Sequence, residues 1–157
     1  FGDKDALFRA VLEAAYAEIR ASEQALKLLD APPQEAIAAL VRFTFRYYIE
    51  HPEFITLLNS ANLHRARHIK GSKRARALNS PLIALIGTIL ERGAREKAFR
   101  CGVDPVQLYI SIAALGYFYL GNAHTLSAIF GRNLTAKRAL EHRAAHMVEV
   151  VLGYLRR

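Results

Sequence analysis

The sequence predicts an all-α fold, a single bundle of about six helices. Apolar residues recur with the 3.6-residue period of a helix, and no segment keeps the two-residue alternation of a strand. Helix-forming residues dominate the composition, whereas the nine Gly and five Pro residues fall mainly at positions that punctuate the apolar periods. A chain of 157 residues suits one domain with a sizeable core.

The first half of the chain is expected to hold three helices. Asp3 is a good N-cap for a helix that runs to about residue 29. Pro33 suits the first turn of a second helix, which ends near His51 because a residue before proline avoids helical backbone angles. A third, shorter helix is expected from about residue 52 to residue 62.

The second half is expected to hold three longer helices. A basic stretch is interrupted at Gly71, after which Ser80-Pro81 predicts a helix that starts there and frays near residue 97. Asp104-Pro105 repeats this N-cap and proline pattern and predicts one long helix to about residue 130, which Gly131 closes. The last helix is expected from about residue 135 to the C-terminus.

The last two of these helices carry more apolar surface than one small bundle covers. Burial of one large apolar side chain is worth about 1.5–3 kcal/mol, so several of them left in water would be a liability. This surplus apolar surface predicts a symmetric dimer, in which the two helices of one protomer pack against the same two helices of its partner as a four-helix bundle. The expected interface residues are Leu126, Phe130, Met147, Val150, Val151 and Tyr154.

The positive charge of the chain is concentrated in one stretch. The formal net charge is +8, and residues 65–76 contain six cations and no acid: Arg65, Arg67, Lys70, Lys73, Arg74 and Arg76. A positive net charge favours polyanionic partners in general, but such a run is most often a solvated helix face or loop. Contact with phosphates and an entrance for acidic ligands remain alternatives.

The segment between Asp104 and Arg132 is long enough to cross a bilayer and needs a separate test. It contains Gln107, Asn122 and His124, which are costly in lipid without partners. A helix that is apolar all round can instead be buried in a core or in an oligomer interface. No membrane partner is therefore expected.

Neither a catalytic site nor a metal site is expected. His64 and His68 stand four residues apart and could share a helix face, but no third ligand accompanies them. The sequence has neither a nucleophile elbow nor a Gly-rich phosphate loop, so we expect no enzyme and no cofactor. The single Cys101 excludes an internal disulfide framework and favours a cytoplasmic location. The first residues are unlike a signal peptide, and the chain is expected to begin inside a longer protein.

Several motifs resemble the TetR family of bacterial transcriptional regulators. The sequence FGDKDALF at residues 1–8 is similar to the segment that joins the recognition helix of these regulators to their fourth helix. The motifs at residues 51–54, 62–68, 104–109 and 122–127 resemble one subgroup of TetR C-terminal domains. The resemblance implies that residues 1–3 are the tail of an N-terminal helix-turn-helix domain. Residues 4–157 would form a TetR-like C-terminal regulatory domain that binds ligand and dimerises.

The resemblance implies a ligand-responsive, DNA-binding repressor that acts as a homodimer. Operator DNA would be bound through the helix-turn-helix head, which lies outside this chain, and a ligand would shift the helix that begins at Asp3. In TetR-like bodies the basic stretch is expected away from the operator side or near the pocket entrance, so direct DNA contact is not the favoured role. The alternative is a stand-alone helical module that binds a small molecule or a protein without a DNA role.

Aromatic residues cluster on the second helix and on the long helix, with a few polar side chains among them. Ligand pockets between helices are mostly apolar and contain a few convergent polar groups. We therefore predict a small apolar or aromatic effector, although a plain aromatic core is the simpler interpretation of any single residue. The expected ligand-binding residues are Phe45, Tyr48, Leu58, Asn62, Tyr109, Tyr117 and Asn122.

Overall fold

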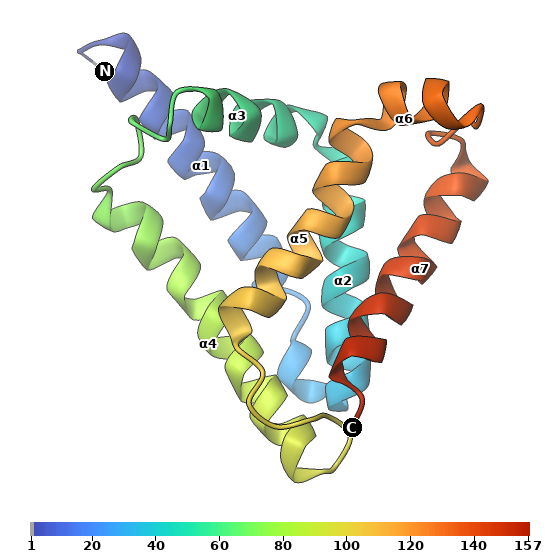
Figure 1. Cartoon of the computed structure of the whole chain (residues 1–157). Helices are drawn as coiled ribbons and strands as arrows, with labels where there is room; N and C mark the ends of the chain where they lie inside the picture. Colours follow the sequence, from blue (N-terminus) through green and yellow to red (C-terminus); the bar gives the residue numbers. More distant parts are fainter. Residues whose placement is uncertain (1) are drawn as a thin grey trace.

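The computed structural model describes residues 2–157, and over these residues it contains seven α-helices, one short 3-10 helix and no strand (Figure 1). The all-α prediction is therefore confirmed for the described part of the chain. Phe1, which belongs to the predicted tail of the DNA-binding domain, lies outside the described residues. Helices α2 (Pro33–Glu50) and α5 (Pro105–Gly121) occupy the middle of the bundle (Figure 1). Helices α1 (Lys4–Gln24) and α4 (Lys73–Arg95) lie on one side of them and α7 (Lys137–Leu155) on the other.

Helix α1 (Lys4–Gln24) begins where the sequence predicts, because the Asp3 carboxylate accepts a 2.7 Å hydrogen bond from the Ala6 amide. It ends earlier than predicted. The backbone turns left-handed at Lys27, with φ 48°, and continues into the 3-10 helix η1 (Leu28–Asp30). The guanidinium of Arg92 donates to the Leu29 carbonyl at 2.7 Å. This contact from α4, distant in sequence, holds the turn.

Helices α2 (Pro33–Glu50) and α3 (Pro52–Leu63) agree with the prediction to within a residue. Each begins with a proline in its first turn, where the missing N–H has no helical partner to lose. His51, with φ −125°, turns the chain between the two helices. Helix α2 is buried on most sides, which makes it the central element of the core.

Helix α4 (Lys73–Arg95) starts earlier than the sequence predicts. Its N-cap is Ser72, whose hydroxyl oxygen accepts a 3.0 Å hydrogen bond from the Ala75 amide, and Pro81 lies inside the helix. A proline there costs about 3 kcal/mol relative to alanine. The buried residues Ala75, Leu82 and Ile86 lie on both sides of Pro81 along one face. Continuous packing of this face therefore outweighs the local signal to stop.

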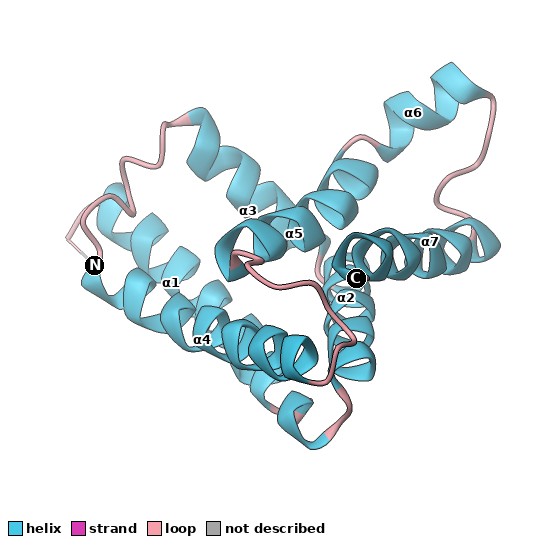
Figure 2. Ribbon diagram, turned by 60° about the horizontal axis from the view of Figure 1, so that its bottom comes forward, coloured by secondary structure: helices cyan, strands magenta, loops and turns pink. Residues whose placement is uncertain are grey.

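The predicted long helix is two helices, α5 (Pro105–Gly121) and α6 (Ala123–Phe130). Asp104 caps α5 as predicted, by accepting a 2.8 Å hydrogen bond from the Val106 amide. The helix breaks at Asn122, whose side-chain amide donates to the Phe118 carbonyl at 2.9 Å, and α6 turns away from the bundle (Figure 2). Gly131, with φ 61°, ends α6. None of the described helices has the length and apolarity needed to cross a membrane.

Helix α7 (Lys137–Leu155) packs along α2. Its inner face contributes Met147, Val151 and Leu155 to the main core, which also contains residues of α2, α4 and α5. A second apolar cluster lies between α1, α2 and α3 and consists of Ile19, Phe43, Tyr47, Tyr48, Phe54 and Ile55.

The predicted interface residues divide between the core and the surface. Met147 and Val151 are completely buried within the chain, so they leave the predicted interface and belong to the protomer core. Phe130, Val150 and Tyr154 are exposed. Leu126 is half-buried on α6. The prediction failed at Met147 and Val151 because a helix packed on its own bundle buries one stripe first, and the sequence pattern does not separate that stripe from a second, outward one.

Candidate functional site

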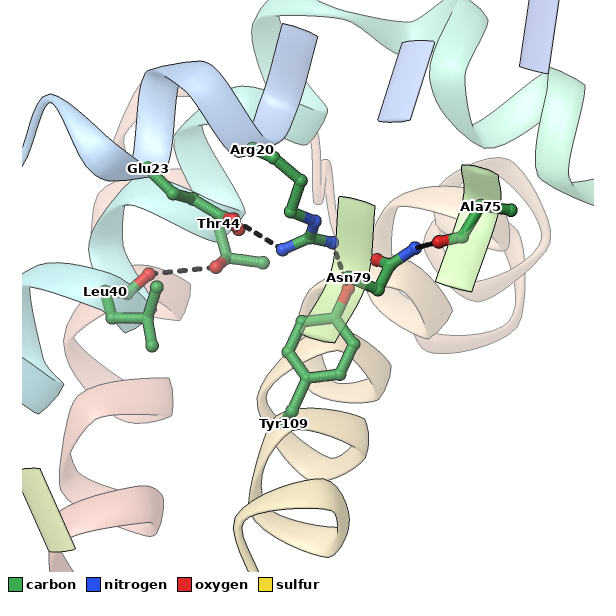
Figure 3. A network of polar contacts seen from close by, with 7 residues as sticks. All are labelled: Arg20, Glu23, Leu40, Thr44, Ala75, Asn79 and Tyr109. Atoms are coloured by element: carbon green, nitrogen blue, oxygen red, sulfur yellow. Dashed lines mark hydrogen bonds and ion pairs between the residues drawn. The ribbon is translucent and has the colours of Figure 1, made fainter. Parts of the chain in front are cut away.

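A buried ion pair lies inside the bundle, between α1 and α5. Arg20 and Glu23 on α1 have only 5% and 2% of their surface exposed, and the guanidinium of Arg20 pairs with the Glu23 carboxylate (Figure 3). The other terminal nitrogen of Arg20 donates a 2.7 Å hydrogen bond to the hydroxyl of Tyr109 on α5. The guanidinium carbon also lies 5.2 Å from the centre of the Tyr109 ring.

The packing of α1 explains why these charges are buried. Glu23 follows the buried Ile19 by one helical turn, and Arg20 follows the half-buried Tyr16 by one turn, so both charges lie on the inward face. Removal of an ion pair from water costs several kcal/mol per ion, and the attraction between the two charges only partly offsets that cost. A buried pair is thus weak support for stability. A buried pair of this kind beside a cavity is a candidate functional site.

Burial and pairing shift the acidity of this group of residues. Burial raises the pKa of the Glu23 carboxyl, and the charge of Arg20 only partly opposes this rise. Burial alone lowers the pKa of Arg20, but Tyr109 and Glu23 together outweigh that effect and raise it. Burial also raises the pKa of Tyr16 and of Tyr48. The tyrosines are therefore protonated at neutral pH, and their hydroxyls are available as hydrogen-bond donors.

A cavity of about 130 Å³ adjoins the ion pair. Its polar wall consists of Arg20, Glu23 and Gln24 on α1, and its other wall is formed by Leu78, Pro81, Leu82 and Leu85 of α4. Within residues 2–157, neither Arg20 Nε nor Glu23 Oε1 has a hydrogen-bond partner, although both atoms are buried. One donor and one acceptor therefore stand unpaired beside an apolar wall, which is the composition of a small-ligand site.

The second apolar cluster adds an aromatic wall near the ion pair. Tyr16 meets Phe54 edge to face, with ring centres 5.8 Å apart, and Tyr48 stacks on Phe54 at 6.0 Å. Tyr16 precedes Arg20 by one helical turn on α1, which brings this cluster close to the ion pair. Of the predicted ligand-binding residues, Tyr109 bonds to Arg20, whereas Tyr48 stacks on Phe54 and lines a separate hollow beside Asn59 and His124.

Phe45, a predicted ligand-binding residue, is a packing residue of the core and does not line the cavity at the ion pair. It is fully buried and meets Tyr119 edge to face at 6.0 Å. A Cβ atom on Gly116 of α5 would lie 3.2 Å from the Phe45 ring and 3.3 Å from the Tyr48 ring. The glycine thus allows α5 to approach α2 closely, and Phe45 serves this packing.

The remaining predicted ligand-binding residues lie elsewhere. The Tyr117 hydroxyl donates to the side-chain carbonyl of Asn59 on α3, and Leu58 is half-buried against the second apolar cluster. Asn62 is exposed, and its amide donates to the Leu58 carbonyl of its own helix at 2.9 Å. Asn122 likewise bonds within its own segment at the end of α5. The structure does not bring these two amides into one site.

Arg20 and Glu23 were absent from the sequence-based site. The signal that could have revealed them is a pair of charged residues on the apolar stripe of the first helix, one turn after Tyr16 and Ile19. The contribution of α4 was hidden because the predicted helix began only at Ser80, which left Leu78 outside it.

A wider surface hollow of about 690 Å³ lies between α5, α7 and the loop that joins α6 to α7, and is lined by Tyr119, Arg132, Arg143 and His146 among others. It is larger than the interior cavity but contains no buried ion pair. Among the described residues there is no group of three His, Cys, Asp or Glu side chains arranged to hold a metal ion. The interior cavity at Arg20 and Glu23 is therefore the strongest candidate site.

A family of domains described as "Tetracyclin repressor-like, C-terminal domain" matches residues 33–151. The chain belongs to the TetR family. This TetR-family chain is also 38% identical, over 157 residues, to the HTH-type transcriptional repressor NicS of Pseudomonas putida. The alignment covers all of this chain and 74% of that protein. The resemblance noted in the sequence is therefore confirmed, and the fold is that of the ligand-responsive body of a TetR-family transcriptional regulator.

Proposed function

We propose that this chain is the effector-binding and dimerising body of a transcriptional repressor that releases operator DNA when a small molecule enters the bundle. The observation that carries the proposal is the buried Arg20–Glu23 pair, with its unpaired donor and acceptor beside the α4 cavity. The relative from Pseudomonas putida is named a transcriptional repressor, and this name supports the DNA role. Operator contact would be made by a helix-turn-helix head joined before Asp3.

The site is well placed to move α1. Ligand pockets usually measure about 300–1,000 Å³, so an effector must widen a cavity of about 130 Å³ by separating α1 from α4. Helix α1 has 21 residues and is about 31 Å long at 1.5 Å per residue. A tilt of about 5° about Arg20 would move Asp3, about 25 Å away, by about 2 Å. Two heads that must fit half-sites one DNA turn apart would lose register.

The effector is proposed to be small and apolar or aromatic, with at least one polar group. The apolar wall of α4, formed by Leu78, Leu82 and Leu85, favours a hydrophobic body for the effector. Arg20 Nε and Glu23 Oε1 would then hydrogen-bond the polar group.

The proposal can be tested by thermal shift of the protein with phenol, indole, benzamide and 2-naphthol as probes. A ligand that binds only the folded state raises its apparent stability. Leu78→Trp, which fills the cavity, should abolish the shift, whereas Ala77→Trp on the exposed side of the same turn should retain it. Absence of a shift with every probe, or an equal shift in the Leu78→Trp variant, would remove the interior cavity as the effector site.

Dimerisation is proposed through the outward faces of α5, α6 and α7. These faces expose Phe118, Ile129 and Phe130 at 59%, 72% and 64%, together with Ile110, Val150 and Tyr154. Large exposed apolar side chains are typical of a protein–protein interface, and a two-fold dimer would bury the same residues on both copies. The cytoplasm, where bacterial DNA lies, remains the predicted location.

A further inference from the structure

We propose that the basic segment at residues 65–76 is a DNA-binding surface of the body itself, which holds the phosphate backbone without reading its sequence. This role rests on the proposed function, because it assumes that the protein works on DNA. It goes beyond that function because operator contact is otherwise assigned only to the separate head. The segment contains six cations and no acid, against a net charge of +8 for the whole chain.

The structure places this basic segment beside the beginning of α1. The side chain of Arg9 donates to the His68 carbonyl at 3.1 Å, and the Ser72 hydroxyl donates to the Glu13 carboxylate at 2.7 Å. The ring of His68 lies 3.2 Å from the Asp5 carboxylate and 4.6 Å from the Phe8 ring. The chain between α3 and α4 therefore follows the N-terminal half of α1 (Figure 1).

This position speaks against the expectation that the segment lies away from the operator side, and we propose the opposite placement. If a DNA-binding head joins α1 at its N-terminus, the same end of the body carries both the head and the positive charge. The pocket-entrance alternative also loses support, because the interior cavity is lined by the later turns of α4, from Leu78 to Leu85.

Most of the charge on the basic segment is not engaged by acids of the body. Arg67 lies 3.5 Å from Asp5, and Arg74 lies 3.9 Å from Glu13, and both arginines are largely exposed. The other four cations have no acidic partner among residues 2–157 and are exposed: Arg65, Lys70, Lys73 and Arg76. Their charge is therefore available to an external anion.

Two local features of this segment work against stability, and a bound polyanion would offset the second of them. Arg65 and Ala66 have φ values of 55° and 54°, a left-handed conformation that strains residues other than glycine. The first turn of α4 contains cations and no acid, although the positive end of a helix dipole favours negative charge. An arriving phosphate would relieve this repulsion.

The scarcity of exposed apolar residues among the cations of the basic segment favours duplex DNA over a lipid surface as its partner. A membrane-binding segment combines cations with several apolar residues that insert into the bilayer, whereas here only Leu63, at the border of the segment, is a large exposed apolar residue. Duplex DNA carries about one charge per 1.7 Å, so several exposed cations on one surface can each meet a phosphate. A dimer would present two such surfaces.

The test is binding of this chain to a fluorescent duplex of about 30 base pairs of arbitrary sequence. Anisotropy is measured between about 50 and 200 mM NaCl. The triple variant Lys70→Gln, Lys73→Gln, Arg76→Gln should flatten the slope of log K against log salt by about 2.7, since each phosphate contact contributes about 0.9. The control variant Lys137→Gln, Arg138→Gln, Arg156→Gln removes the same charge from exposed positions on and after α7 and should leave the slope nearly unchanged.

The outcomes separate this proposal from the function on which it rests. Equal flattening in both variants would overturn the proposal, because only net charge would then matter. No duplex binding by the chain, or binding to phosphatidylserine vesicles without binding to DNA, would also overturn it. Either result leaves operator binding through the head intact. Failure of the regulator with its head to bind any DNA would instead reject the proposed function. Circular dichroism confirms that both variants fold.

Discussion

The Arg20 guanidinium donates a 2.7 Å hydrogen bond to the Tyr109 hydroxyl, across 89 positions of sequence, and this bond joins α1 to α5. The same guanidinium pairs with Glu23, so one side chain connects the helix expected to carry the DNA-binding head with the centre of the bundle. Any ligand that competes for Arg20 therefore acts on the position of α1.

Removal of the Tyr109 hydroxyl tests this bond. Tyr109→Phe leaves a buried guanidinium nitrogen without its acceptor, and the free energy of unfolding should fall by about 1–3 kcal/mol in a urea titration. Tyr117→Phe is the matched control, because the Tyr117 hydroxyl bonds to Asn59 at an exposed position. That control should lose less than about 1 kcal/mol. Equal decreases in the free energy of unfolding of the two variants would show that the Arg20–Tyr109 bond contributes no more to stability than an exposed hydrogen bond.

Loss of one member of the Arg20–Glu23 ion pair should destabilise the protein more than loss of both. Arg20→Met leaves the buried Glu23 carboxylate uncompensated and should cost about 3–5 kcal/mol, whereas Arg20→Met with Glu23→Leu should recover most of that loss. Urea titrations of both variants at neutral pH measure the difference. A double variant as unstable as the single one would argue that packing, and not charge, holds this part of α1.

Stability should depend on pH through Glu23. Its folded-state pKa is raised by burial, so the native state holds the Glu23 proton more tightly than the unfolded state, and stability falls as pH rises above the ordinary value of 4.5. Glu23→Gln cannot ionise. The unfolding free energy of the variant minus that of the wild type should therefore increase between pH 4.5 and pH 7. A difference that stays constant over this range would contradict the raised pKa.

Two glycine-to-alanine substitutions should change the stability of the protein in opposite directions. Gly116→Ala places a methyl group 3.2 Å from the ring of Phe45 and 3.3 Å from that of Tyr48, and these core rings cannot withdraw. It should destabilise by about 1–3 kcal/mol. Gly87→Ala meets only Pro105, at 3.9 Å, and should stabilise α4 by about 0.5–1 kcal/mol. Thermal unfolding of both variants measures these changes in stability. Stabilisation by Gly116→Ala would contradict the close approach of α5 to α2.

The outward apolar faces should control oligomeric state. Phe118→Glu combined with Val150→Glu places charges on the proposed interface and should convert a dimer into a folded monomer, as measured by light scattering after gel filtration. Leu63→Glu changes an even more exposed apolar residue, on α3, and should leave the mass unchanged. A wild-type mass of one subunit would reject the dimer.

Local signals in the sequence determined the fold class and most helix ends. Asp3, Asp104 and Gly131 act through hydrogen bonds or backbone angles within a single turn, and their roles were predicted correctly. Contact of Tyr48 and Tyr109 with an effector stays a prediction.

Only the tertiary structure decided where α4 begins, where α5 breaks and which polar residues form the site. Pro81 is tolerated because buried residues on both sides of it pack continuously, and that packing is absent from any local window. Arg20 and Glu23 look like surface charges until α4 and α5 cover them, since burial depends on contacts between residues far apart in the chain. The position of the basic segment likewise follows from its contacts with α1, which no spacing in the sequence encodes.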